Sequence, residues 1–293
     1  MAPGILPLAF GTQAMATTKA EELKRRVRDH WDAQACGTQN TAQPKFSREY
    51  FDEIEALRYQ LEPFIFSFAQ FTRHRGQKVL EVGVGAGTDF VQWVRANAEA
   101  YGVDLTPEAI EHVRNRLAVY GLQARDFRVA DCESLPFEDE TFDLVYSWGV
   151  IHHTPDTAQA LAEIVRVLRP GGMAKLMVYH RHSLVGLYQW VKWALLRGRP
   201  WRSISWCFHN CVESPGTKAF TRSEVLRMLQ PQPVENLQIR TILTRQDRLG
   251  GHNPLARGVA RLMTTIAGPD RAGFYMTIQF RKQKKQKIQA HEG

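Results

Sequence analysis

Val79-Leu80-Glu81-Val82-Gly83-Val84-Gly85-Ala86-Gly87-Thr88 is the stretch of sequence that decides the fold. Its apolar half predicts a buried strand, and its glycine-rich half predicts a tight turn that leads into a helix. Glycines leave room for a ligand to touch the backbone, and a helix N-terminus offers unpaired N–H groups and a positive dipole end. We therefore expect a polar ligand at this turn.

The chain beyond this turn alternates between strand and helix patterns, which is typical of a parallel sheet covered on both faces. Arg169-Pro170-Gly171-Gly172 is expected to end a helix and return the chain to the sheet. The predicted class is α/β, with a doubly wound, Rossmann-like sheet. Strands are expected at residues 78–82, 100–103, 126–130, 142–147, 173–179, 235–244 and 273–280, and helices at 88–97, 107–120 and 157–168.

The regions outside this alternation suggest how the chain is organised. Helically spaced aromatic and aliphatic residues precede the first strand, and a tryptophan-rich insertion follows the fifth. Both are expected to fold over a ligand pocket as a lid or to pack as plain core. The expected division is a disordered leader (1–17), an N-terminal helical annex or lid (18–77), a cofactor-binding core (78–182), an aromatic helical insertion or lid (183–220), the end of the core (221–280) and a basic tail (281–293).

Glu81 decides which ligand the glycine turn favours. A dinucleotide fingerprint spaces its glycines G-x-G-x-x-G, whereas this chain has G-x-G-x-G. A carboxylate at the mouth of the turn repels a pyrophosphate but attracts an ammonium and a sulfonium group. S-adenosylmethionine carries both groups, so the sequence favours it over a nicotinamide cofactor.

Two further acids follow the next predicted strands. Asp104 lies where an acid can accept hydrogen bonds from ribose hydroxyls, with a helix cap as the alternative. Thr106, just before Pro107, is expected to cap the next helix and to leave Asp104 free for the ligand. Asp131 could accept from an adenine amino group, or it could be a solvated loop acid.

These segments, together with Phe142-Asp143-Leu144-Val145-Tyr146-Ser147-Trp148-Gly149-Val150-Ile151-His152-His153, resemble class I methyltransferases, and most closely the type 11 group that includes ubiquinone and menaquinone C-methyltransferases. The resemblance covers about residues 78–179. It implies a seven-stranded sheet with an antiparallel C-terminal hairpin, and S-adenosylmethionine as cofactor, converted to S-adenosylhomocysteine. It further implies Glu81, Gly83 and Gly85 at the methionine portion, Asp104 at the ribose, Asp131 and Cys132 at the adenine, and Ser147 and Trp148 beside the methyl donor. The full set of predicted cofactor contacts is Glu81, Gly83, Gly85, Gly87, Asp104, Leu105, Asp131, Cys132, Glu133, Ser147 and Trp148.

Three histidines follow predicted strands and are candidates for a general base. His152 and His153 come after the fourth strand and His180 after the fifth. An imidazole suits the deprotonation of a hydroxyl or an acidic carbon, but each ring could equally pack against the cofactor or cap a helix. His180 and His182 have no accompanying carboxylates, so no metal site is expected.

Composition limits the remaining choices. A hydrophobic share of 44% and a charged share of 23% exclude a disordered chain and a membrane-spanning one. The net charge is +8, and the last thirteen residues hold +4 of it, which is typical of a solvated basic tail. The four cysteines show no secreted disulfide pattern, and no basic segment precedes the short apolar run at residues 5–10, so a cytoplasmic location is expected.

The sequence therefore favours a methyltransferase that acts on a small to medium, partly apolar molecule, by O- or C-methylation. RNA or protein remains the alternative acceptor, because arginines 197, 199 and 202 interleave with tryptophans 201 and 206. A cofactor-binding regulatory module without turnover is the other alternative. No transmembrane segment is expected, and peripheral contact with a membrane stays open.

Overall fold

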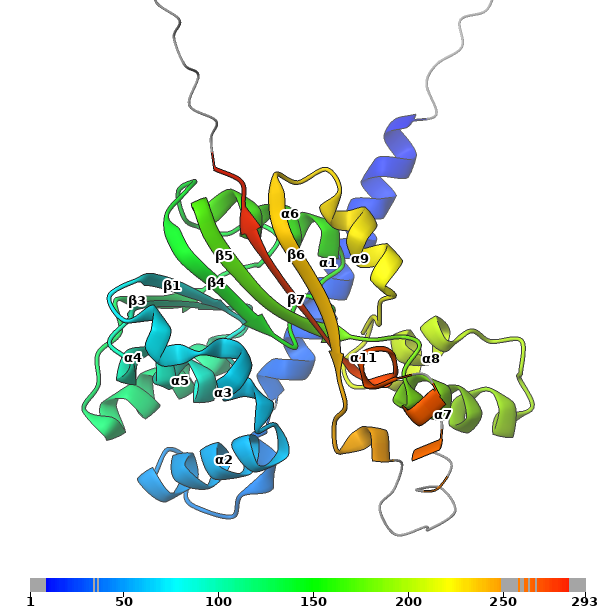
Figure 1. The fold of residues 1–293 in the computed structure, drawn as a ribbon, viewed down its shortest axis with the longest axis horizontal. Coiled ribbons are helices and arrows are strands. Elements are labelled where there is room, and N and C mark those ends of the chain that lie inside the picture. The colour runs from blue at the N-terminus through cyan, green and yellow to red at the C-terminus, as the bar shows by residue number, and fades with distance from the viewer. Residues whose placement is uncertain are drawn as a thin grey trace, which may run out of the picture.

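The computed structural model describes residues 9–33, 35, 37–248, 258, 261–262, 264–266 and 268–284. A seven-stranded sheet forms its centre, with the spatial order β3-β2-β1-β4-β5-β7-β6 (Figure 1). The strands are β1 (Lys78–Val82), β2 (Glu99–Asp104), β3 (Asp126–Val129), β4 (Phe142–Trp148), β5 (Leu168–Tyr179), β6 (Val234–Ile242) and β7 (Tyr275–Lys282).

Strands β1 to β5 pair in parallel, and β7 runs antiparallel between β5 and β6. This is the doubly wound sheet with an antiparallel C-terminal hairpin that the sequence and its resemblance predict, so the expected fold class is confirmed. From β1 the chain adds β2 and β3 on one side, and β4 and β5 then follow on the other side of β1. The strand order thus reverses between β1 and β4, and open α/β sheets bind ligands at such a point.

Helices cover both faces of the sheet and also extend from it (Figure 1). The α-helices are α1 (Ala9–Ala33), α2 (Arg48–Leu61), α3 (Phe64–Ala69), α4 (Thr88–Arg95), α5 (Pro107–Tyr120), α6 (Thr157–Val167), α7 (Leu184–Trp193), α8 (Ile204–Cys211), α9 (Arg222–Leu229) and α11 (Pro269–Ala272). Short 3₁₀ helices are η1 (Thr38–Asn40), η2 (Phe71–His74), η3 (Leu195–Arg197) and η4 (Gln246–Arg248).

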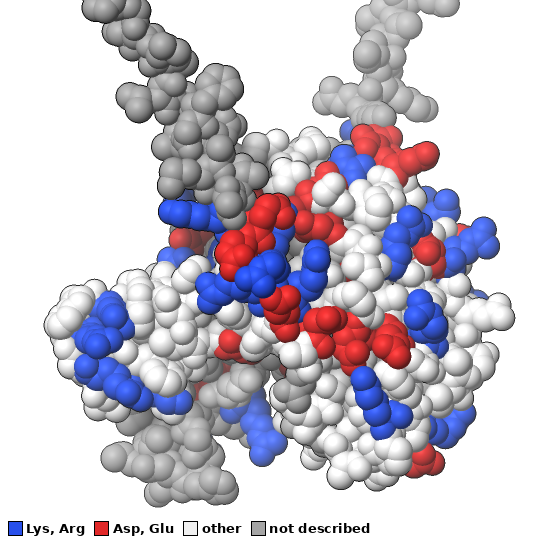
Figure 2. All heavy atoms as spheres, turned by 180° about the vertical axis from the view of Figure 1, so that it is seen from behind, with Lys and Arg blue, Asp and Glu red and all other residues white. Residues whose placement is uncertain are grey.

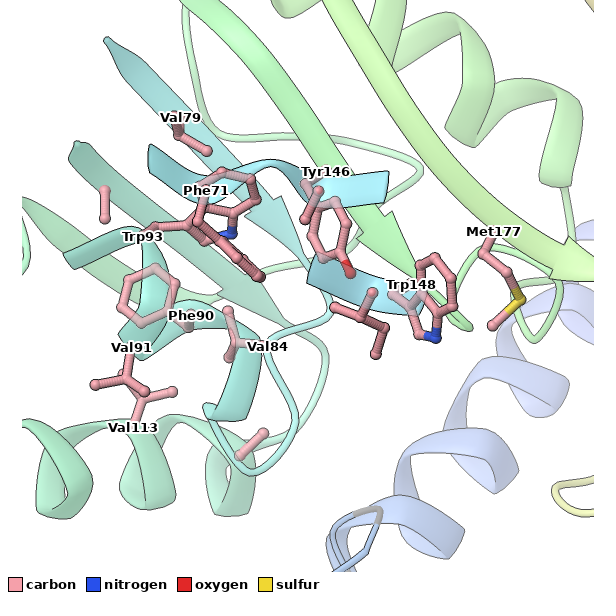
Figure 3. Packing of buried hydrophobic residues seen from close by; sticks show 14 of the residues in the cluster. Phe71, Val79, Val84, Phe90, Val91, Trp93, Val113, Tyr146, Trp148 and Met177 are labelled. Atoms are coloured by element: carbon pink, nitrogen blue, oxygen red, sulfur yellow. The ribbon is translucent and has the colours of Figure 1, made fainter. Parts of the chain in front are cut away.

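Two large hydrophobic clusters pack against the two faces of the sheet, and a smaller third one includes Phe51 and Ile54 of α2. The first joins α4 and α5 to the strands through large side chains such as Trp93 and Tyr146, and the second joins α6 and α9 through residues such as Leu161 and Val225. Figure 3 shows the first cluster, with Trp148 and Met177 at the end where it meets the cavity described below. Because β1 to β5 are parallel, their carboxyl ends lie at one edge of the sheet, next to this cavity.

Most predicted elements match the structure, and three differ from it. Helix α1 begins at Ala9, inside the segment expected to be a disordered leader; residues 1–8 lie outside the described part. Strand β5 begins at Leu168, which pairs with Phe142, and regular pairing resumes at Met173; Arg169-Pro170-Gly171-Gly172 forms an irregular bulge between them, with Gly171 at a φ of 80°. Helix α6 thus ends before this segment as predicted, but the segment lies inside the strand and not ahead of it. Strand β7 continues to Lys282, into the segment expected to be a basic tail, of which residues 285–293 are outside the described part.

Within the described residues, no helix combines the length and the apolar character that crossing a bilayer requires.

Candidate active site

A cavity of about 380 Å³ lies at the carboxyl ends of β1, β2, β4 and β5. Helices α1 and α2 contribute to its walls through residues such as Val27, Trp31, Leu57 and Leu61. From the insertion at residues 183–220, Glu213 contributes to the lining of the cavity. The N-terminal helices thus line the cavity and remain the candidate lid, whereas α7 and α8, for which a lid or plain core packing was expected, extend away from the sheet (Figure 1).

The glycine turn fits closely against neighbouring chain. A Cβ atom at Gly83 would lie 2.1 Å from a Val150 methyl group, so no larger residue is tolerated there. Gly83 and Gly85 line the cavity, as predicted for contacts to the methionine portion. Gly87 does not; it is the left-handed N-cap of α4, and a Cβ there would come within 3.1 Å of Val113. The packing of α4 against α5 and the left-handed backbone explain why residue 87 is a glycine.

Glu81 is a buried acid at the mouth of this turn. Its side chain is only slightly accessible, and Trp93 donates its indole N–H to Oε2 at 2.9 Å. Burial, followed by the nearby charge of Asp89, raises the pKa of Glu81 well above its ordinary value. A positively charged ligand group in the cavity would compensate both effects, because it favours the ionised carboxylate.

Asp104 at the end of β2 is more engaged than expected. Thr106 caps α5 as predicted, accepting from the Ala109 N–H at 3.3 Å. Asp104, however, is not left free: Oδ2 accepts from the Gly85 N–H at 3.0 Å, and Oδ1 accepts from the Thr106 N–H and hydroxyl at 3.0 and 2.9 Å. Asp104 thus fixes the glycine turn, and Oδ2 keeps one lone pair for a ligand hydroxyl.

Asp131, expected at the adenine, is held in an ion pair with α1. Lys24 Nζ lies 2.7 Å from Asp131 Oδ2 and 2.6 Å from Glu133 Oε2. Despite partial burial, these two carboxylates raise the pKa of Lys24 above its ordinary value, so the lysine stays charged. Glu133 also accepts from Thr154 and from the Asp156 N–H, and it does not line the cavity. Lys24 therefore ties the lid to the predicted adenine position.

The other predicted cofactor contacts divide into two groups. Leu105, Cys132 and Trp148 line the cavity, and burial raises the pKa of the Cys132 thiol to about 12, so it stays protonated. Ser147 is fully buried within β4 and does not reach the cavity. A side chain on the strand next to a lining residue points to the opposite face, which explains the difference between Ser147 and Trp148.

Beyond Trp148 the lining of the cavity includes a second carboxylate, that of Glu62, the C-cap residue of α2. Glu62 accepts from the Trp148 indole N–H and from the Tyr275 hydroxyl, at 2.9 and 2.8 Å. Arg58 Nη1 lies 3.6 Å from the same carboxylate. These contacts orient Trp148 and Tyr275 along the wall between the two ends of the cavity.

The far end of the cavity holds His153, Glu213 and Tyr179. The Tyr179 hydroxyl donates to the Glu213 carboxylate, at 2.8 and 2.9 Å to its two oxygens. His153 Nε2 lies 3.6 Å from Glu213 Oε2. Glu213 has a left-handed backbone with φ of 52°, a costly conformation for a non-glycine residue that is often found at functional sites.

The hydrogen bonds of His153 indicate which of its nitrogens carries the proton. The Thr217 hydroxyl donates to the Ser214 carbonyl at 2.7 Å, so its oxygen can only accept from His153 Nδ1, 3.1 Å away. We therefore assign the proton to Nδ1, with the Ser214 hydroxyl oxygen, at 2.8 Å, as a second acceptor. This leaves the lone pair of Nε2 facing Glu213.

Burial determines the charge of these groups. It lowers the pKa of His153 to about 3, with smaller contributions from His30 and Lys218, so the ring is neutral at pH 7. Burial also raises the pKa of Glu213, although the Tyr179 hydrogen bond opposes this. A neutral imidazole has a free lone pair for a ligand proton, and an ionised Glu213 carboxylate beside it would offset part of the cost of a buried positive charge.

The other two candidate histidines lie outside the cavity lining. His152 is fully buried between His153 and Tyr179, with ring centroids 4.2 and 4.0 Å away. His180 Nδ1 donates to the Gly273 carbonyl at 3.1 Å, and its backbone bridges to Phe220. Burial lowers the pKa of both rings. His180 thus connects the end of β5 to neighbouring chain.

Among the described residues, His152, His153 and Glu213 form a group that could hold a metal ion, because their candidate ligand atoms lie within 4.8 Å of one another. His180 and His182, for which the sequence predicts no metal site, have ring centroids 6.3 Å apart.

Residues 80–176 match the family profile described as a methyltransferase domain, in its type 11 group. This segment contains the glycine turn, Asp104, Asp131 and His153. Residues 80–176, called the methyltransferase domain below, are thus similar to that family.

Curated relatives match over the same part of the chain. The phthiotriol/phenolphthiotriol dimycocerosates methyltransferase 1 of Mycobacterium ulcerans is 42% identical over 99 residues, which is 33% of this chain and 35% of the relative. Methyltransferase GfsG of Streptomyces halstedii is 37% identical over 100 residues, 33% of this chain and 36% of the relative. The chain thus spans about a third of the length of these relatives in the match.

Solved structures extend the likeness of fold beyond the methyltransferase domain. The YcgJ protein of Bacillus subtilis superposes with a TM-score of 0.53 at 19% identity, over 78% of this chain and 100% of that one. The [4+2]-cyclase SpnF gives 0.51 at 17% identity, over 93% and 95%. A phosphoethanolamine N-methyltransferase of Haemonchus contortus, solved with S-adenosylhomocysteine, gives 0.53 at 16%, over 88% and 60%. At these identities the likeness concerns the fold alone.

The residues of the methyltransferase domain fit S-adenosylmethionine, the cofactor that the family implies. Glu81 is a buried carboxylate that a cation would stabilise, Gly83 keeps the turn clear of side chains, and Asp104 retains an acceptor position. Asp131 would have to share its carboxylate with Lys24 or exchange that partner.

The sequence did not indicate Glu213, Glu62, Tyr179 or Lys24 as site residues. None lies in a recognisable motif, and Lys24 and Glu62 precede the domain in sequence. Glu213 carried one faint signal: it is the single acid within the basic and aromatic insertion at residues 183–220.

Proposed function

We propose that the protein is an S-adenosylmethionine-dependent methyltransferase with a small to medium, partly apolar acceptor and S-adenosylhomocysteine as the second product. The observation that carries the proposal is the buried Glu81 at the glycine turn, in a cavity that continues to a neutral histidine. The methyltransferase domain and its named relatives support it. We extend the proposal to a cytoplasmic location, which the cysteine pattern predicts.

The cofactor would supply an electrophilic methyl group. Glu81 would bind the ammonium of its methionine portion, and the free acceptor position on Asp104 would bind a ribose hydroxyl. Methyl transfer from a sulfonium is an in-line displacement, so alignment and exclusion of water matter most. Helices α1 and α2 would exclude water, since they contribute Val27, Trp31 and Leu61 to the cavity wall.

The acceptor would lie at the far end of the cavity. His153 Nε2 would take the proton from an acceptor hydroxyl or acidic carbon as the new bond to the methyl group forms. The Glu213 carboxylate, oriented by the Tyr179 hydroxyl, would stabilise the protonated imidazole. His152 and His180 then have supporting positions, since neither lines the cavity.

The cavity wall supports a partly apolar acceptor. Leu57, Leu61 and Met177 line it together with the rings of Trp148 and Tyr275. Beside these apolar residues, the polar groups of His153 and Glu213 lie close together and could orient an acceptor, as polar groups do in small-molecule sites. One of the relatives named above is a phthiotriol/phenolphthiotriol dimycocerosates methyltransferase, which favours lipid-like or polyketide-like hydroxyl compounds as the first acceptors to test.

A transfer assay tests the proposal. The purified full chain is incubated with methyl-labelled S-adenosylmethionine and a panel of phenols, long-chain alcohols and polyketide-like hydroxy acids, and the release of S-adenosylhomocysteine is measured. We expect turnover with at least one apolar hydroxyl compound, and none with His153→Ala. Turnover confined to RNA or protein substrates would contradict the acceptor assignment. Tight cofactor binding without turnover on any panel member would favour a regulatory module.

A further inference from the structure

The positive charge of the chain is concentrated in two segments. Residues 183–212 contain Lys192, Arg197, Arg199 and Arg202 and no Asp or Glu, a net formal charge of +4. Residues 281–293 also sum to +4, so the rest of the chain carries 8 − 4 − 4 = 0. The first segment comprises α7, η3 and α8, which project from the sheet as one lobe (Figure 1). After the half-turn to Figure 2 this lobe lies on the left, where the visible spheres are white and blue without red.

The far end of this lobe exposes large apolar side chains. Leu195-Leu196-Arg197-Gly198-Arg199-Pro200-Trp201, which we call the insertion tip, is exposed at every residue. Leu196 is 75% exposed and Trp201 is 78% exposed, and Leu187 and Tyr188 of α7 are also exposed. Single exposed apolar residues are ordinary, but several in one short segment mark an interaction site.

Two hydrogen bonds stabilise the conformation of the insertion tip and of the residues that flank it. The Arg199 N–H donates to the Ala194 carbonyl at 2.8 Å, and the Trp190 indole N–H donates to the Arg202 carbonyl at 2.8 Å. The base of the lobe is attached to the core, because Val185 and Phe208 are buried in the first hydrophobic cluster. The exposed apolar side chains of the tip therefore belong to a folded segment, and they do not pack into its hydrophobic core.

The chemistry of the lobe matches an anionic bilayer better than RNA. Arg202 lies 3.5 Å from the centre of the Trp206 ring, and Lys192 and Arg197 lie 4.9 and 5.2 Å from that of Trp193. These cations already contact the ring faces on which RNA bases would stack. Exposed leucines do not serve RNA binding, whereas leucine, tryptophan and arginine together suit the boundary between headgroups and acyl chains.

We propose that the insertion tip binds the surface of an anionic lipid bilayer. Leu195, Leu196 and Trp201 enter the interface, while Arg197 and Arg199 contact the acidic headgroups. Apolar insertion and electrostatic attraction are each weak alone and act together in peripheral proteins. This goes beyond the proposed methyl transfer and does not depend on it, since the binding needs neither cofactor nor acceptor.

Vesicle co-sedimentation of the full chain, without cofactor, tests the inference. Wild-type protein should sediment with phosphatidylcholine vesicles that contain about 30% phosphatidylglycerol, and much less with pure phosphatidylcholine. Leu196→Ser/Trp201→Ser, which changes no charge, should abolish most of the binding. Arg197→Gln/Arg199→Gln should weaken it about tenfold or more, and high salt should do the same to the wild type.

Leu226→Ser is the matched control, because Leu226 of α9 is 49% exposed and lies outside the lobe. It should bind vesicles as the wild type does. Circular dichroism and thermal melting of each variant confirm that a loss of binding is not a loss of fold. Equal binding by all variants, or no binding by the wild type, overturns the proposal. Binding to single-stranded RNA but not to vesicles, or a dimer in light scattering that the serine variants abolish, would also overturn it.

Discussion

At the cofactor end of the cavity, Gly85 and Asp104 are joined by a hydrogen bond across 19 residues of sequence; at the acceptor end, Glu62 and Tyr275 are joined across 213. The first end is made by turns at the carboxyl ends of adjacent strands, inside the methyltransferase domain. The second needs α2, β7 and the end of the insertion to meet. Cofactor binding and acceptor chemistry should therefore be separable by mutation.

The largest effect is expected at Glu213, where the comparison predicts a loss of turnover without a loss of cofactor affinity. Glu213→Gln removes the charge that stabilises protonated His153, and should lower kcat about 10²- to 10⁴-fold, the usual contribution of general base catalysis. Calorimetry with S-adenosylhomocysteine should give an unchanged Kd. Glu138→Gln, which removes a carboxylate outside the cavity lining, serves as the control.

The pH profile sharpens this prediction. Burial raises the pKa of Glu213 above its ordinary value, and the ionised form is the active one, so kcat should fall as the pH falls through that raised pKa. The acid limb of the profile should disappear in Glu213→Gln. An unchanged limb would assign the titration to another group.

At the cofactor end, Glu81→Gln should have opposite effects on binding and on stability. It should weaken S-adenosylmethionine binding by about 1.5–3 kcal/mol, the range for hydrogen bonds to charged groups. Because the folded-state pKa of Glu81 is raised, the free energy of unfolding of the wild type falls as the pH rises from the ordinary value of 4.5 to the raised one. The variant lacks this loss, so its Tm without ligand should exceed that of the wild type at pH 7. A lower Tm would show that Glu81 is needed for folding itself.

Asp104→Ala should weaken cofactor binding by about 1–3 kcal/mol, since it removes the ribose acceptor and leaves the Gly85 N–H without its partner. Asp104→Asn separates these two roles, because an amide oxygen can still accept from that N–H while the charge is lost. Wild-type affinity in Asp104→Ala, measured by calorimetry, would discard the ribose assignment.

A smaller effect is expected at Lys24, which joins the lid to the cofactor end. Lys24→Met removes the ion pairs with Asp131 and Glu133, so α1 should open more readily and the dissociation rate of S-adenosylhomocysteine should rise severalfold. Stopped-flow fluorescence of Trp31, which lines the cavity, can follow the release. Lys19→Met is the control, because Lys19 is an exposed lysine of the same helix that does not line the cavity. Slower release would mean that Lys24 competes with the adenine instead.

No effect is expected from chelation. His153 Nδ1 is satisfied by hydroxyl oxygens and Glu213 by the Tyr179 hydroxyl, so the proposed chemistry needs no ion. Activity should survive treatment with EDTA followed by gel filtration. Loss of activity that Zn²⁺ or Mn²⁺ restores would assign a metal to His152, His153 and Glu213.

The difference between the two ends also explains how far the sequence leads. Strand and helix periodicity predicts the sheet, and the ends of successive strands place Glu81 and Asp104 on one edge, because that placement follows from parallel topology alone. Which side chains face the cavity is harder: Trp148 does and Ser147 does not, although both belong to the same predicted motif. The sequence predicted Asp104 to be free, but a short acid after a strand is also an obvious partner for nearby backbone N–H groups.

The acceptor end could not be predicted, since its polar groups meet only through tertiary packing. Glu213 and Glu62 lie in segments without a motif, and Lys24 acts across the long separation between α1 and Asp131. His153 was predicted as a candidate base, but nothing in the sequence distinguishes it from His152. The distinction comes from the turn that supplies Ser214 and Thr217.

Titration calorimetry of the wild-type chain, with S-adenosylhomocysteine or S-adenosylmethionine in one experiment and NAD⁺ in another, tests most directly whether acidic groups around the glycine turn select a cationic nucleoside. We expect saturable heat from either S-adenosyl compound, at one site per chain, and none from NAD⁺. Saturable binding of NAD⁺ with no heat from either S-adenosyl compound would contradict it.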